Sequence, residues 1–243
     1  MNIWLASGNK HKQQELTAIF GGDLRSTSAR SQSERDTIKL PAEAGITGFD
    51  PEETGTSFAE NALIKARVLY NLLGSDFLAE NPGPILADDS GLCVDALEGK
   101  PGIYSARYYG KDSWASDGKF WEKSVPAKLT DEQRNLLLLE ELDNISSMEI
   151  VKQSPSARGR RNCRFVCAMV LFFSPEHFYL IQETLEGEIV PSAAEIRGRG
   201  GFGYDPIVYL PELGRTVAEL SEEEKNQLSH RGKAGRTIAK LLH

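Results

Sequence analysis

The chain has 243 residues, of which 40% are hydrophobic and 26% are charged, and its formal net charge is −7. This length and composition fit one large globular domain or two small ones with a sizeable buried core. The negative charge disfavours general binding to nucleic acid, and no apolar stretch approaches the roughly 20 residues of a membrane span.

The chain opens with a predicted strand, tight loop and helix. Residues 2–6 (NIWLA) are a short apolar run, turn-forming residues follow at 7–9, and apolar residues then recur at helical spacing. Residues 21–50 are polar and irregular, which predicts a surface excursion. A second helix is expected to begin near Ser57, which forms an S-x-x-E capping box with Glu60.

The next predicted strand ends in two adjacent carboxylates. In the stretch PILADDSGL, an apolar run leads directly into Asp88 and Asp89, and a serine and a glycine follow. We therefore expect both aspartates at the carboxyl end of a buried strand. Residues 111–135 have no clear period and predict an insertion or a helical excursion.

The second half of the chain predicts a β-hairpin and a C-terminal helix. Residues 164–173 (RFVCAMVLFF) read as a central strand, and residues 177–190 alternate well enough to pair with it. A glycine-rich stretch at 198–203 precedes a further strand. A capping box at Ser221 opens a helix that is expected to run to Leu242 with a bend at Gly232. Strands mixed with helices in this way predict an α/β protein with a mixed sheet.

Two features indicate a reduced, cytoplasmic protein. The first residues, MNIWLASGNK, lack the cationic start and apolar middle of a signal peptide. Three cysteines in a chain of this length argue against a disulfide scaffold.

The loop SGNKHK, at residues 7–12, is a candidate phosphate-binding site. A strand, a turn that contains glycine and a helix start present free backbone N–H groups and a positive dipole end to an anion. Lys10 and Lys12 add charge. The spacing is not that of a Walker loop, and an ordinary connection between strand and helix fits the residues equally well.

The two aspartates at 88 and 89 allow three explanations. They could cap a turn, share one proton as a pair, or bind a hard metal ion. A metal would account both for two carboxylates and for their place at a strand end, where ligand sites of α/β sheets collect. Glu52 and Glu53, ahead of the second helix, could add a ligand.

Two further stretches are candidate base-binding segments. In GGFGYDP, the glycines would let the backbone approach a flat ligand, and Phe202 or Tyr204 offers a ring for stacking, although a glycine-rich bend filled by core aromatics is the alternative. Lys225 is expected in the first turn of the C-terminal helix, where a cation opposes the helix dipole, so it favours an anionic ligand. His230 and Arg231 are neighbouring donors.

In this order, these stretches resemble the inosine triphosphate pyrophosphatases, which hydrolyse nonstandard purine nucleoside triphosphates. The matching segments, which span nearly the whole chain, are SGNKHK, ETGTSFAENALIKA from 53 to 66, ADDSGLCVDALEGKPGIYSARY from 87 to 108, GFGYDP, and AELSEEEKNQLSHRGKA from 218 to 234. The resemblance implies an elongated α/β fold over residues 1–243. It would be one domain, with a long mixed sheet, flanking helices and two lobes with the active cleft between them, as a homodimer.

The resemblance also implies a set of site residues. It makes Asp89 the general base, and Glu53 and Asp89 ligands of Mg²⁺. The implied substrate-binding residues are Ser7, Gly8, Asn9, Lys10, His11, Lys12 and Lys65 for the phosphates, Ser90 for the nucleotide, and Phe202, Gly203, Tyr204, Asp205, Lys225, His230 and Arg231 for the base and sugar.

The expected reaction converts ITP, dITP or XTP to the monophosphate and pyrophosphate. Hypoxanthine and xanthine present a 6-oxo acceptor where adenine presents an amino donor, so hydrogen-bond donors in the site would select them. Two alternatives are a pyrophosphatase for modified pyrimidine triphosphates and a nucleotide-binding regulator without activity. The pair of carboxylates argues against the regulator, because a pure binder of a polyanion gains little from added negative charge.

Overall fold

The computed structural model describes residues 1–23, 36–110, 129–147, 161–198, 200–201 and 203–242. Over these residues the strands form one mixed sheet in the order β2-β1-β3-β4-β5-β6-β7. The strands are β1 (Asn2–Leu5), β2 (Thr37–Lys39), β3 (Ile85–Val94), β4 (Asn162–Ser174), β5 (His177–Ile189), β6 (Val208–Leu210) and β7 (Arg215–Thr216). The predicted mixed α/β sheet is confirmed, because β1 runs parallel to β2 and β3 while β6 is antiparallel to β5 and β7.

The α-helices flank this sheet. They are α1 (Lys10–Asp23), α2 (Phe58–Glu80), α3 (Asp131–Ser147), α4 (Glu222–Leu228) and α5 (His230–Leu241). Among the described residues, none of the helices has both the length and the apolar character needed to cross a bilayer.

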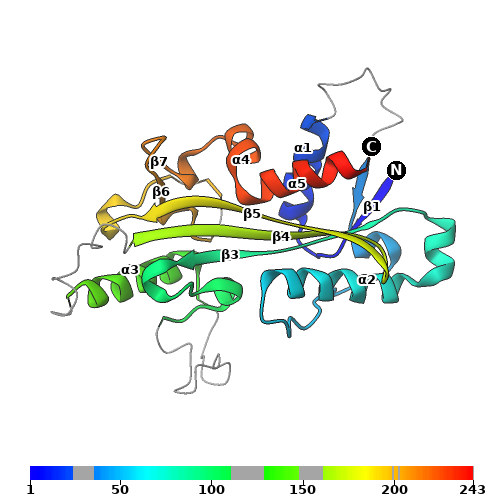
Figure 1. Cartoon of the computed structure of the whole chain (residues 1–243), viewed down its shortest axis with the longest axis horizontal. Helices are drawn as coiled ribbons and strands as arrows, with labels where there is room; N and C mark the ends of the chain where they lie inside the picture. The colour runs from blue at the N-terminus through cyan, green and yellow to red at the C-terminus, as the bar shows by residue number, and fades with distance from the viewer. Residues whose placement is uncertain (24–35, 111–128, 148–160, 199, 202, 243) are drawn as a thin grey trace. The chain divides into compact units, whose positions relative to one another are not determined.

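The chain divides into two compact units. The first unit comprises residues 1–90, 166–184 and 226–243, and the second comprises residues 91–165 and 185–225. In the first unit, α1 and α5 lie side by side on one face of the strands, and α2 lies on the other face (Figure 1). Alternate strand residues accordingly enter different layers: Leu5 and Leu86 pack with Leu16 of α1, whereas Trp4 makes an edge contact with Phe77 of α2.

The second unit has its own core around α3 and the parts of β3, β4 and β5 that belong to this unit. This core includes Leu92, Leu138, Phe165, Tyr204 and Ile207, all of which are less than a tenth exposed. The region 111–135, predicted as an insertion or helical excursion, gives a regular helix only from Asp131 onward, and residues 111–128 lie outside the described residues.

The structure corrects two expected elements. Residues 21–50 are not wholly irregular, because residues 37–39 form the edge strand β2. The C-terminal helix is not one helix bent at Gly232 but two, since Ser229 interrupts it and its hydroxyl accepts a hydrogen bond from Gly232 N as the N-cap of α5. The predicted capping box at Ser221 is confirmed: Ser221 N donates to Glu224 while Ser221 Oγ accepts from Glu224 N. At Ser57 the predicted cap is confirmed, since Ser57 Oγ accepts from Glu60 N, and the Glu60 carboxylate accepts from Thr56 N.

Candidate active site

Asp88 and Asp89 lie inside a strand, so the prediction that they end one is wrong. β3 continues to Val94 and buries both carboxylates, with exposed fractions of 2% and 7%. The neighbouring parallel strand, β1, does end at this level of the sheet. Leu5 of β1 is paired with Leu86 of β3, and the last hydrogen bond runs from Ala6 N to Leu86 O. The aspartates therefore lie on β3 just beyond the end of β1. Because side chains alternate along a strand, they project from opposite faces and do not form a pair.

Asp88 faces α1 and α5 and is held by two cations. Lys12 Nζ lies 2.9 and 3.0 Å from the two Asp88 oxygens, and Arg231 Nε donates to Asp88 Oδ2 at 3.2 Å. Burial disfavours the carboxylate, but the charges of Lys12 and Arg231 outweigh it and keep the pKa of Asp88 far below its ordinary value. Arg231 also donates to Glu15 and to Ser90 Oγ, each at 2.9 Å. All three guanidinium nitrogens thus bind protein oxygens.

Asp89 faces α2 and shares a cation with Glu53. Lys65 Nζ lies 2.9 Å from Asp89 Oδ1 and 2.9 Å from Glu53 Oε1. Burial raises the pKa of Asp89, Lys65 opposes the rise, and the charge of Glu53 adds to it. Burial alone would lower the pKa of Lys65, but the carboxylates around it, that of Asp89 foremost, raise it above the ordinary value. Lys65 therefore stays charged, and Asp89 is a stronger base than an exposed aspartate.

The loop at residues 7–12 has the geometry of a helix N-terminus. Asn9 Oδ1 accepts hydrogen bonds from His11 N at 2.8 Å and Lys12 N at 3.3 Å, and Asn9 N donates to Ser7 Oγ at 3.1 Å. Asn9 is thus the cap of α1. The side chains of Lys10 and His11 are exposed.

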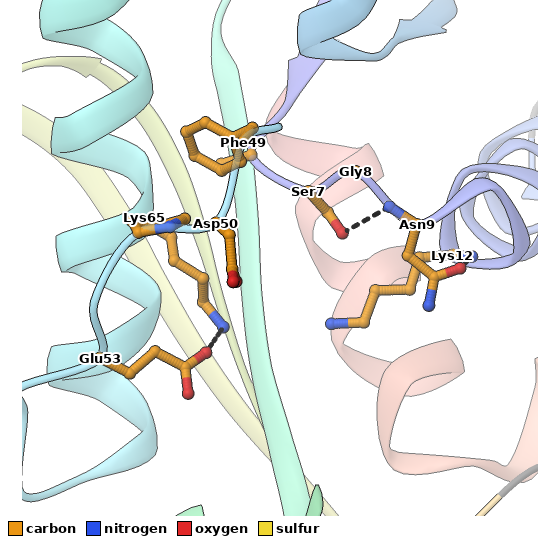
Figure 2. A pocket seen from close by; sticks show the side chains of 10 residues that line it. Ser7, Gly8, Asn9, Lys12, Phe49, Asp50, Glu53 and Lys65 are labelled. Atoms are coloured by element: carbon orange, nitrogen blue, oxygen red, sulfur yellow. Dashed lines mark hydrogen bonds and ion pairs between the residues drawn. The ribbon is translucent and has the colours of Figure 1, made fainter. Parts of the chain in front are cut away.

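This loop and the residues around Glu53 line one pocket of about 430 Å³, all within the first unit. Figure 2 shows the ammonium groups of Lys12 and Lys65 extending into it from opposite sides. Its lining comprises Ala6, Ser7, Gly8, Asn9, Lys12, Phe49, Asp50, Pro51, Glu53 and Lys65. The sequence argument missed Phe49, Asp50 and Pro51, although an Asp-Pro dipeptide is a recognisable loop signal.

The described residues of the GGFGYDP segment and Lys225 lie in the second unit. Lys225 and Asp205 form an ion pair. Lys225 occupies the last turn of the short helix α4, where the helix dipole favours a cation, so the dipole argument for a ligand there was wrong. Tyr204 is 4% exposed and donates to Ser105 O at 3.0 Å, which makes its ring part of the core. Phe202 lies outside the described residues.

The Gly203 backbone is fixed by the first turns of α3. Gly203 N donates to Asp131 Oδ2 at 2.8 Å, and Asn135 Nδ2 donates to Gly203 O at 3.1 Å. His230 begins α5 in the first unit and is buried. Sequence reasoning missed Asp131 and Asn135, because nothing local marks helix residues that bind a loop 72 and 68 positions away.

The carboxylates near Lys65 fit a magnesium ion in their chemistry. Within the described ranges, no three His, Cys, Asp or Glu side chains gather closely enough to hold a metal by themselves. Glu53 and Asp89 already share one cationic group, and both supply hard oxygen ligands. Mg²⁺ commonly takes one or two carboxylates and completes its shell with water and phosphate oxygens. Glu53 and Asp89 would therefore hold the ion jointly with a phosphate.

Comparison with known proteins gives consistent results over the whole chain. The model of the Ham1 family matches residues 3–241. A dITP/XTP pyrophosphatase of Treponema denticola is 39% identical over 242 residues, which is 100% of this chain and 98% of that protein. One from Geobacillus kaustophilus is 37% identical, covering 96% of this chain and 89% of that protein. The solved structure of a HAM1 protein from Coxiella burnetii superposes with a TM-score of 0.71 at 33% identity, covering 100% of this chain and 98% of that one.

Proposed function

The chain belongs to the Ham1 family, and we propose that it is a pyrophosphatase that hydrolyses nonstandard purine nucleoside triphosphates. The substrates are ITP, dITP and XTP, and the products are the monophosphate and pyrophosphate, so the enzyme removes these nucleotides from the pool. The main support is the contact of Lys65 with both Glu53 and Asp89 beside the loop at 7–12. This arrangement brings together a cation that could bind phosphate, a buried carboxylate that could act as a base, and the N-terminus of α1.

The triphosphate is assigned to the pocket of the first unit. Its walls supply the ammonium groups of Lys12 and Lys65 and the polar loop at 7–9. Lys10 and His11 follow on the exposed first turn of α1. A chain with a net charge of −7 binds a polyanion only where its cations are concentrated, and these residues provide such a place.

We further propose that Mg²⁺ is held by Glu53 and Asp89. Bound there, it would offset charge on the phosphates and on the leaving pyrophosphate. Asp89 orients a water molecule and accepts its proton as the water oxygen attacks the α-phosphorus. The bond between the α-phosphorus and its bridging oxygen breaks, and pyrophosphate leaves. Burial raises the pKa of Asp89 above its ordinary value, which makes its carboxylate a stronger proton acceptor than an exposed aspartate.

Base recognition is proposed for Phe202, Gly203, Asp205, Lys225 and His230. Tyr204 serves this segment from the core, through its bond to Ser105. Arg231 is assigned to holding Asp88 and Ser90 in place, because all three of its guanidinium nitrogens bind protein oxygens. Donors that face a 6-oxo group would be left opposite the amino group of adenine, which disfavours ATP.

The decisive experiment is product analysis with a panel of triphosphates. We expect the purified protein with Mg²⁺ to convert dITP, ITP and XTP to monophosphate and pyrophosphate, at rates up to roughly 10⁴ times the ATP rate, and EDTA to stop the reaction. Equal rates on all purine triphosphates would contradict the selectivity. Faster turnover of a modified pyrimidine triphosphate, or binding of dITP without turnover, would favour one of the two alternatives.

Three further properties belong to the proposal. Phe173, Phe178, Tyr179 and Leu180 are large exposed side chains on β4 and β5, which supports a homodimer that light scattering would detect. The free cysteines at 93, 163 and 167 support a reducing, cytoplasmic location. The net negative charge supports the proposal that the protein does not bind nucleic acid.

A further inference from the structure

We propose that Asn61 is a positioning residue that fixes Asp89 and the loop of Glu53 relative to each other. This inference rests on the proposed function, because it concerns the two carboxylates assigned to the metal ion. Asn61 lies on α2, four residues before Lys65, and its side chain touches both segments.

Both ends of the Asn61 amide are used. Its Nδ2 donates to Asp89 Oδ2 at 3.3 Å, and its Oδ1 accepts from Gly55 N at 2.9 Å. The orientation of the amide is determined by chemistry, since the carboxylate only accepts and the backbone N–H only donates. A flipped amide would place two acceptors together and two donors together. Asn61 is 0% exposed, so water does not compete for these bonds.

Gly55 provides a second, steric observation. A Cβ added at Gly55 would lie 2.6 Å from Asn61 Oδ1 and 2.7 Å from Glu60 Cβ, both closer than real contacts of a Cβ. The loop thus approaches α2 so closely at Gly55 that only glycine fits at this position. Glu53, two residues earlier, is thereby tied to the same helix that carries Asn61 and Lys65.

The two oxygens of Asp89 have different partners, and this difference defines the proposed role of Asn61. Asp89 Oδ1 accepts from Lys65, and Asp89 Oδ2 accepts from Asn61. Lys65 is a charged group whose contacts change when a phosphate or a metal ion binds nearby, whereas Asn61 is neutral and buried and attracts neither. Asn61 therefore keeps the Asp89 carboxylate and the Glu53 loop at a constant separation while the charges around them change. Loss of a residue that hydrogen-bonds a metal ligand commonly lowers metal affinity or activity by about 10–100-fold.

The test compares Asn61→Leu, which keeps the branched shape and the number of heavy atoms of the side chain and removes both hydrogen bonds, with the wild type. We expect kcat for dITP to fall by about 10–100-fold and the half-saturating Mg²⁺ concentration to rise by about 10-fold, while KM for dITP at saturating Mg²⁺ changes by less than about 3-fold. Titration of the nucleotide-free protein with Mn²⁺, followed by electron paramagnetic resonance, should show a similar weakening of metal binding.

Two variants separate positioning from general stability. Leu69→Ala removes a fully buried side chain of the same helix that lies outside the proposed site, so it should lower Tm and leave kcat and Mn²⁺ affinity unchanged. Gly55→Ala retains Asn61 and displaces the loop, so it should reproduce the metal defect even if Asn61→Leu folds poorly.

If Asn61→Leu and Gly55→Ala lower Tm but keep wild-type kcat and Mn²⁺ affinity, Asn61 is a structural residue and the inference is overturned. That outcome leaves the proposed function intact, because the wild-type protein still releases pyrophosphate from dITP. A wild-type protein that fails to do so removes the proposed function instead, and the Mn²⁺ titration then still decides whether Asn61 positions a metal site.

Discussion

Asp88 and Asp89 are adjacent in β3, yet each binds cations on a different face of the sheet. Asp88 contacts Lys12 and Arg231 on the side of α1 and α5, and Asp89 contacts Lys65 on the side of α2. Two carboxylates in sequence thus enter two electrostatic environments, one strongly stabilising the charge and one raising the pKa. The difference predicts opposite consequences for substitutions at neighbouring positions.

Asp88→Asn should mainly destabilise the fold. The change leaves the buried guanidinium of Arg231 and the ammonium of Lys12 short of a counter-charge, and breaking such a buried pair typically costs about 3–5 kcal/mol. In a chain of this size the loss corresponds to a Tm lower by roughly 10 °C. Differential scanning calorimetry measures it, and an unchanged Tm would contradict the assignment of Asp88 as a structural anion.

Asp89→Asn should abolish turnover and leave the fold at least as stable as the wild type. Burial raises the pKa of Asp89, which means that the fold disfavours its charged form, and asparagine removes that charge. We expect dITP hydrolysis to fall by at least about 10³-fold, since the variant would lose both the proposed base and a proposed metal ligand. Near wild-type kcat in a folded Asp89→Asn protein would remove Asp89 from the mechanism.

Asn135→Leu should weaken substrate binding more than catalysis. The variant loses the hydrogen bond to Gly203 O, so the predicted base-binding segment is held less firmly. A lost hydrogen bond of about 1–1.5 kcal/mol corresponds to a roughly 10-fold higher KM for dITP, with kcat changed by less than about 3-fold. Glu132→Gln, on the exposed side of the same helix, is the matched control and should behave as wild type. A fall in kcat with an unchanged KM would show that Asn135 does not act through substrate binding.

The ion pair of Arg215 and Glu224 should appear as an acid-sensitive contribution to stability. The hydrogen bond from Arg215 and that from the Ser221 backbone lower the pKa of Glu224 from 4.5 to about 2. Because the folded pKa is depressed, the stabilisation is complete above the unfolded pKa and is lost as the pH falls through the folded value.

NMR titration of Glu224 measures this shift directly, and in Arg215→Met the pKa should return toward 4.5. The difference in Tm between the wild type and Arg215→Met should shrink between about pH 6 and about pH 2. A difference that persists at the lower pH would show that Arg215 stabilises the fold by packing.

The three thiols should differ in reactivity. Burial raises the pKa of Cys167 to about 12 and also raises the pKa of Cys163, and both are buried, whereas Cys93 is partly exposed. Since the thiolate is the reactive form, iodoacetamide at about pH 8 should alkylate Cys93 first and the other two only after denaturation. Mass spectrometry of the intact protein counts the adducts, and rapid double alkylation would refute the burial of the inner thiols.

Local signals in the sequence predicted the elements that local chemistry determines. The strand, loop and helix at the start, the helix cap at Ser57 and the hairpin around residue 175 all follow from patterns within about a dozen residues. The break at Ser229 also had a local signal, since serine is a favoured N-cap, but the continuous helical pattern concealed it. β2 had none, because its three residues form a strand only by pairing with β1.

The electrostatic arrangement was not predictable from neighbouring residues. The Ser-Gly pair after the aspartates suggested a turn, yet the strand continues because the buried charge of Asp88 is offset by Lys12, 76 positions away, and Arg231, 143 positions away. Lys65 entered the argument through the family resemblance alone, whereas Glu53 was already a candidate ligand from its place ahead of the second helix. Asn61 and Asn135 could be recognised only once the atoms that they bind were known.

Asn9 gives the loop at residues 7–12 a property that, under the proposed function, would affect how fast a nucleotide docks. Its carboxamide already satisfies the leading amides of α1, so the loop adopts its shape through contacts within the chain itself. A ligand that meets such a preorganised loop pays little conformational entropy on arrival, because there is little left to order. Docking would then be limited by electrostatic steering toward Lys12 and Lys65, and it should slow as ionic strength rises while the architecture of the loop stays the same.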